Sequence, residues 1–104
     1  MERRAARRFT LNLPLQLRYE SEGSLFEKAA QTRDVSFRGM YFMSESPMAL
    51  GHSIECVLTL PQQITQAGNV HIRCFARILR CEEQVAGHGI AARIERYEFL
   101  PGPA

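Results

Sequence analysis

Two short groups of residues stand out as suited to holding an anion or a nucleotide. The first is an N-terminal arm that contains four arginines, Arg3, Arg4, Arg7 and Arg8. The second is the segment 34–39, which reads Asp-Val-Ser-Phe-Arg-Gly. Arginine presents a planar fork of donors that pairs with phosphate, carboxylate or a guanine edge and can stack on a ring. The arm therefore predicts an anion site, and the second segment supplies one carboxylate and one hydroxyl.

The charge of the chain is concentrated in that arm. The 104 residues carry 13 Lys+Arg and 11 Asp+Glu, a formal net charge of +2. Lys28 is the one lysine and Asp34 the one aspartate. The arm has four arginines against one glutamate (+3), which leaves nine cations and ten acids (−1) for the rest. A pI of about 8.6 argues against a protein that wraps long nucleic acid, since such proteins show a strong basic stripe.

Composition excludes several other classes of protein. The length suits one domain, and no apolar run reaches the ~18 residues of a membrane span. The charged start has no apolar signal-peptide core, and three cysteines without a Cys-x-x-Cys spacing favour a reducing compartment. We expect a soluble, cytoplasmic protein. Neither a nucleophile with its base nor a metal-ligand spacing among His52, His71 and His88 is present, so we expect no enzyme, metal or cofactor.

Alternation of apolar and polar residues predicts short strands along the whole chain. Segment 27–33 is ambiguous, because its alanines suit a helix as well as a strand. No convincing amphipathic helix exceeds ten residues, so the pattern predicts an all-β fold, a small antiparallel β-sandwich or barrel. The clearest strand signals are at residues 11–19, 40–43, 54–60, 70–78 and 90–94.

In this order the motifs resemble the PilZ domain family, whose members bind the bacterial second messenger cyclic di-GMP. The family's Arg-x-x-x-Arg matches Arg4 and Arg8. Arg8 lies six residues before Pro14. Its Asp-x-Ser-x-x-Gly matches Asp34, Ser36 and Gly39. The Gly-x-Gly that opens its last core strand matches residues 87–89.

The resemblance covers about residues 2 to 96 and implies a fold and a set of domain boundaries. The fold is a six-stranded antiparallel β-barrel of the split-barrel type with a flexible arm. We expect one domain over residues 1–104, with the arm at 1–9, the barrel at about 10–96 and a tail at 97–104.

The resemblance also implies a ligand, cyclic di-GMP, and a role for each motif residue. Arg4 and Arg8 would clamp guanine and phosphate, while the Asp34 carboxylate suits the N–H donors of a guanine edge and Ser36 adds a small donor and acceptor. Gly39 would permit a positive φ or close approach of the ligand to the backbone. Because four neighbouring arginines repel one another until an anion arrives, we expect the arm to become ordered on binding.

Several alternatives stay open at this stage. Arg3 and Arg7 have the same spacing as Arg4 and Arg8, and an arginine at position 3 agrees with two intercalated ligand molecules per chain. The arm could instead be a solubilising tail, and segment 34–39 a simple turn. A ligand-independent interaction module of the same fold and a small RNA-binding barrel are the rival functions. We expect an unidentified downstream protein partner, a monomer or weak dimer, and a solvated face at Arg73 and Arg77.

Overall fold

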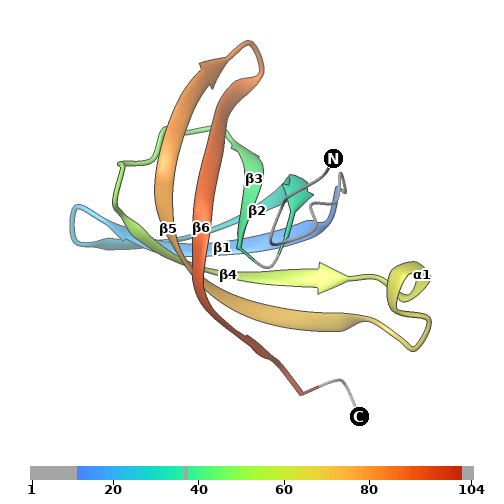
Figure 1. Ribbon diagram of the computed structural model, residues 1–104. Helices are drawn as coiled ribbons and strands as arrows, with labels where there is room; N and C mark the ends of the chain where they lie inside the picture. Colours follow the sequence, from blue (N-terminus) through green and yellow to red (C-terminus); the bar gives the residue numbers. More distant parts are fainter. Residues whose placement is uncertain (1–11, 37, 102–104) are drawn as a thin grey trace, which may run out of the picture.

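Six strands and one short helix make up the computed structural model, which describes residues 12–36 and 38–101 (Figure 1). Segment 27–33, which suits a helix as well as a strand by sequence, is part of the second strand. The elements in chain order are β1 (Pro14–Ser21), β2 (Ser24–Val35), β3 (Gly39–Ser44), β4 (Ser53–Leu60), α1 (Gln62–Thr65), β5 (Val70–Gln84) and β6 (Gly87–Phe99).

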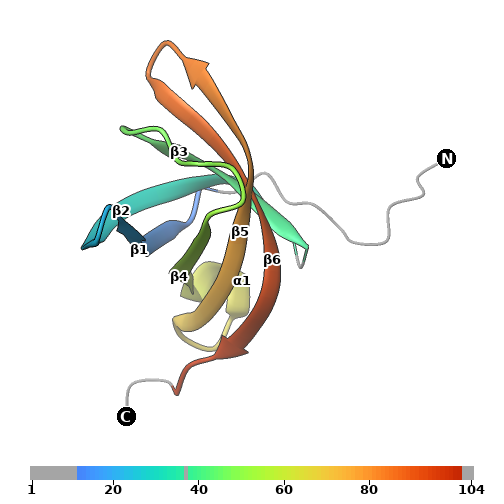
Figure 2. The same cartoon turned by 90° about the vertical axis from the view of Figure 1, so that its left-hand side faces the viewer.

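The strands close into a barrel in the order β1-β2-β3-β6-β5-β4, and every neighbouring pair is antiparallel. The sheet closes where β1 pairs with β4, for example Leu15 opposite Leu58. Figure 2, turned by 90°, shows the strands wrapping around a common interior. The expected six-stranded antiparallel barrel is confirmed.

One face of each strand fills the interior, because successive side chains of a strand point to opposite sides. Leu13, Leu15 and Leu17 are at most 2% exposed, whereas the residues between them are exposed. Phe42 and Ile90 have no exposed surface at all. Burying a side chain of this size stabilises the fold by about 1.5–3 kcal/mol. The remaining buried apolar residues are Val35, Met40, Met48, Ile54, Cys56, Leu58, Cys74, Ala76, Ile78 and Ala92.

The β1–β2 hairpin turns through two residues with positive φ, Glu22 at 54° and Gly23 at 81°. Positive φ at both central residues is typical of a type I′ turn, whose twist matches that of the flanking antiparallel strands. Pro14 is the first residue of β1, where its missing N–H costs least.

Strands β5 and β6 are the longest, and their hairpin projects beyond the other strands (Figure 1). Their register shifts twice, between Phe75 and Ala76 and between Ile78 and Arg80. The second shift leaves Leu79 as an extra residue on β5. The expected barrel end near residue 96 falls inside β6, which continues to Phe99.

Candidate functional site

Asp34 lies near the end of β2, just after an irregularity in the pairing with β3. The register shifts between Thr32, opposite Phe42, and Asp34, opposite Tyr41. Thr32 is fully buried, while Asp34 is partly exposed. A bulge of this kind changes which way the following side chains face, and bulges are frequent beside binding sites.

Ser36 stabilises the connection between β2 and β3. Its backbone N–H donates to the Gly39 carbonyl at 2.9 Å, and its Oγ accepts from the Arg38 N–H at 3.2 Å. A serine hydroxyl both donates and accepts, so this group can also donate to a ligand. Ser36 thus serves the turn and keeps a donor beside Asp34.

Gly39 is required by the neighbouring strand. Its φ lies outside the positive region, so the expected freedom of φ is not what this position uses. A Cβ built here would lie 2.7 Å from the Ala92 carbonyl oxygen on β6, far inside ordinary contact. The strand backbones therefore approach more closely than a side chain would allow.

These three residues line a groove of about 300 Å³ on the outside of the barrel. Four residues form one row across its strands, because Asp34 pairs with Tyr41, Tyr41 with Ala91, and Ala91 with Arg80. Ala91 and Gly39 are small, so few side-chain atoms fill the middle of the groove. The motif residues form one wall, and Leu79 and Arg80 of β5 together with Arg93 of β6 form the other side.

The groove carries more positive than negative charge. Arg38, Arg80 and Arg93 line it together with a single carboxylate, Asp34. A larger hollow of about 840 Å³ lies over β1, β4 and β5 and is lined by Glu20, Glu55 and Glu95 but only one arginine, Arg18. An anionic ligand therefore fits the smaller groove better on electrostatic grounds.

Tyr41 covers the second glycine of the Gly-x-Gly motif. A Cβ on Gly89 would overlap the Tyr41 hydroxyl. That hydroxyl donates to Glu82 Oε1 at 3.2 Å and accepts from Gln84 Nε2 at 2.6 Å, so the ring is tied to the end of β5. Burial is the main cause that raises the pKa of Tyr41 above its ordinary value of 10.0, and the hydrogen bond to Glu82 is the second cause. Tyr41 therefore stays a neutral donor at neutral pH.

Arg3, Arg4, Arg7 and Arg8 lie outside the described residues, and so does the predicted ordering of the arm. The chain enters the barrel next to the groove, because Leu13 and Thr32 are linked by two hydrogen bonds. The Leu13 N–H donates to Thr32 Oγ1 and the Thr32 N–H donates to the Leu13 carbonyl, each at 3.0 Å. Thr32 is two residues from Asp34. The arm is therefore attached close to the motif wall.

Sequence reasoning missed the second wall, which consists of Leu79, Arg80 and Arg93. These residues are 45 to 59 positions beyond Asp34, and only the strand register brings them to its side of the barrel. The extra residue in β5 decides which of its side chains face the groove. An alternation broken at Ile78-Leu79-Arg80 is the one sequence signal that could have indicated it.

Arg73 and two of the three cysteines have structural surroundings that do not suggest a second site. Arg73 contacts Glu55 at 3.3 Å and Glu98 at 3.6 Å, in agreement with a solvated face. Cys56 and Cys74 face each other in the core as free thiols.

Two searches within residues 12–36 and 38–101 give negative results. No group of three His, Cys, Asp or Glu side chains there could hold a metal ion. No helix there is long and apolar enough to cross a membrane.

Comparison with known proteins identifies the family. The model of the PilZ domain matches residues 2–101. No curated protein matches the chain. Among solved structures, the inhibitor of motility of Bacillus subtilis (MotI/DgrA) has a TM-score of 0.74 at 16% identity, a similarity of fold. The match covers 92% of this chain but only 44% of that protein. PilZ domains are binding and regulatory modules, and this chain belongs to the PilZ domain family.

Proposed function

We propose that this protein is a receptor for cyclic di-GMP that binds the ligand in the groove beside Asp34. The observation that carries the proposal is that Asp34, Ser36 and three arginines line one groove of a PilZ barrel. A cyclic dinucleotide of guanine presents two phosphates and two guanine edges. Arginine pairs with both kinds of group, and a carboxylate complements the N–H donors of guanine.

The N-terminal arm would close over the bound ligand. A groove of about 300 Å³ is at the low end of the ~300–1,000 Å³ typical of ligand pockets, so a dinucleotide would protrude from it. Arg8 is five residues before Leu13, a span of at most about 18 Å in an extended chain. Arg4 and Arg8 could then clamp the exposed side of the ligand, and ordering of the arm would be the signal that a protein partner senses.

Isothermal titration calorimetry with cyclic di-GMP tests the proposal, with cyclic di-AMP and a short RNA as controls. We expect binding of cyclic di-GMP alone, and the stoichiometry will report one or two ligand molecules per chain. No heat with cyclic di-GMP at tens of micromolar would refute the proposal and favour a ligand-independent interaction module. Heat with the RNA alone would favour the RNA-binding barrel.

Three alanine variants test the assigned residues. Arg8→Ala and Asp34→Ala should each weaken binding by at least ~1 kcal/mol, the lower end for a bidentate base contact. Arg18→Ala is the matched control, because it removes the same charge from an exposed side chain on β1, away from the groove. Unchanged affinity in both test variants would refute the assignment. Protection of the arm from protease only in the presence of ligand would support the switch.

A further inference from the structure

Two arginines on the far wall of the groove differ from the other arginines of β5 and β6 in how weakly they are held. Arg80 has one contact within the described residues, to Glu82 at 3.6 Å, and Arg93 has one, to Glu95 at 3.9 Å. Their side chains are 64% and 58% exposed. Exposed ion pairs of this kind contribute little to stability, so these guanidinium groups are available to a ligand.

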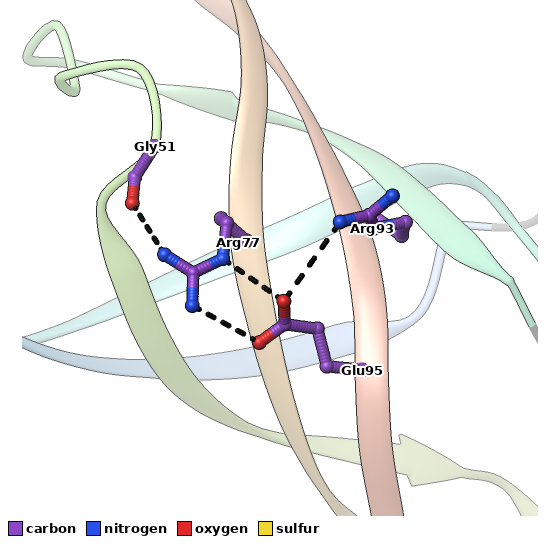
Figure 3. A network of polar contacts seen from close by, with 4 residues as sticks. All are labelled: Gly51, Arg77, Arg93 and Glu95. Atoms are coloured by element: carbon purple, nitrogen blue, oxygen red, sulfur yellow. Dashed lines mark hydrogen bonds and ion pairs between the residues drawn. The ribbon is translucent and has the colours of Figure 1, made fainter.

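Arg77 shows the contrasting case on the same strand (Figure 3). Its Nε and Nη2 donate to the two Glu95 oxygens at 2.9 and 3.5 Å, and its Nη1 donates to the Gly51 carbonyl at 2.9 Å. These bonds tie β6 to the loop before β4. The donors of Arg77 are therefore used in contacts within the fold, whereas Arg93 only approaches the same carboxylate from the other side (Figure 3).

The carboxylates beside the two arginines keep other partners if these arginines bind a ligand instead. Glu95 retains Arg77, and Glu82 retains the Tyr41 hydroxyl. Exchange of these contacts for a phosphate or a guanine edge leaves no carboxylate without a partner. The exchange therefore avoids the main cost of breaking an ion pair.

The strand register places Arg80 across the groove from Asp34, and it places Arg93 on β6, next to Gly39. Arg80 is in the same row as Asp34, three strand spacings away, or roughly 14 Å at about 4.8 Å each. Arg93 pairs with Gly39, so no side chain of β3 stands directly beside it. The extra residue Leu79 is 48% exposed on the same wall and offers an apolar surface to a base.

We propose that Arg80 and Arg93 form a second contact wall, outside both sequence motifs, in which Arg80 binds the part of the dinucleotide farthest from Asp34 and Arg93 binds the part beside Gly39. The ligand's second guanine or its second phosphate would meet the forked donors, and Leu79 would pack against the base. This inference rests on the proposed function, and it adds the residues that set affinity on the β5–β6 side.

Calorimetry with cyclic di-GMP on Arg80→Ala, Arg93→Ala and the control Arg18→Ala tests the second wall. We expect each wall variant to bind at least about fivefold more weakly and the control to bind as the wild type does. Thermal unfolding should be unchanged, because all three side chains are exposed. Wall variants that bind no more weakly than the control would overturn the second wall alone, whereas a wild type that does not bind would overturn the proposed function as well.

The conservative variant Arg80→Lys separates a forked contact from simple charge. Lysine keeps the positive charge but has no planar fork of donors. We expect its affinity to lie between those of the wild type and Arg80→Ala. An affinity equal to that of the wild type would overturn the bidentate contact.

Discussion

Gly39→Ala tests whether the close approach of β3 and β6 is built into the barrel. The added Cβ would lie 2.7 Å from the Ala92 carbonyl oxygen, where ordinary contact begins at 3.4 Å. The difference, 3.4 − 2.7, is 0.7 Å. The obstacle is backbone, and β6 is also held here by the hydrogen bond from the Ile94 N–H to the Arg38 carbonyl at 2.8 Å. Rotation of a side chain cannot relieve this overlap.

The expected cost is that of forcing an extra carbon into a packed region, about 1–3 kcal/mol. At roughly 4–8 °C per kcal/mol for a domain near 100 residues, a loss of about 2 kcal/mol lowers the unfolding midpoint by about 8–16 °C. Circular dichroism during heating measures this shift. The reasoning also predicts weaker ligand binding, because β3 carries one side of the groove.

Gly89→Ala is the matched comparison, since its obstacle is a side chain. There the added carbon meets the Tyr41 ring and hydroxyl. Tyr41→Ala should remove that conflict, so the double variant should be less destabilised than the sum of the two single variants. A Gly39→Ala protein that melts within about 2 °C of the wild type would refute the close approach and leave ligand contact as the reason for this glycine.

Three further predictions concern the core and the polar contacts. Phe42→Ala should cost about 3–5 kcal/mol in urea unfolding, because this ring is fully buried; a loss below 1 kcal/mol would contradict the packing. The hydrogen bond from Arg77 lowers the pKa of Glu95, so its stabilising effect is present above the unfolded carboxyl pKa of about 4.3 and is lost as pH falls through the lower folded value. The urea midpoint of the wild type should therefore exceed that of Glu95→Gln at pH 6 and converge with it toward pH 3; a gap independent of pH would contradict this. Iodoacetamide should modify the half-buried Cys81 before the buried Cys56, as read by peptide mass spectrometry, and equal rates would show that solvent reaches the core.

The fold could be predicted from sequence because its core depends on a period of two. The leucines at 13, 15 and 17 are buried as the alternation indicates, and so are the alternating apolar residues of β4 and β5, which are Ile54, Cys56, Leu58, Cys74, Ala76 and Ile78. The resemblance to the PilZ domain family predicted that the barrel has six strands. The irregularities were not predictable, since a bulge depends on how two strands pair. The shift that makes Leu79 an extra residue of β5 is one example.

The candidate site divides in the same way between local and long-range determinants. Asp34, Ser36 and Gly39 are close in sequence, and a short motif could therefore identify them. Arg80 and Arg93 were not separable from the other arginines of β5 and β6, because their availability depends on which carboxylates lie nearby. Arg77 has the same residue type and strand but is held by Glu95 and Gly51.

The long-range origin of the groove links ligand binding to folding of the whole barrel. Asp34 and Arg80 are 46 residues apart, and they share one row only while β2, β3, β6 and β5 are paired in register. A slip of one residue in any of these pairings would turn the side chains of that strand to the other face. A ligand that contacts both walls therefore recognises the closed barrel rather than a single hairpin. Its binding free energy must then add to global stability, because no locally folded part of the chain presents both walls.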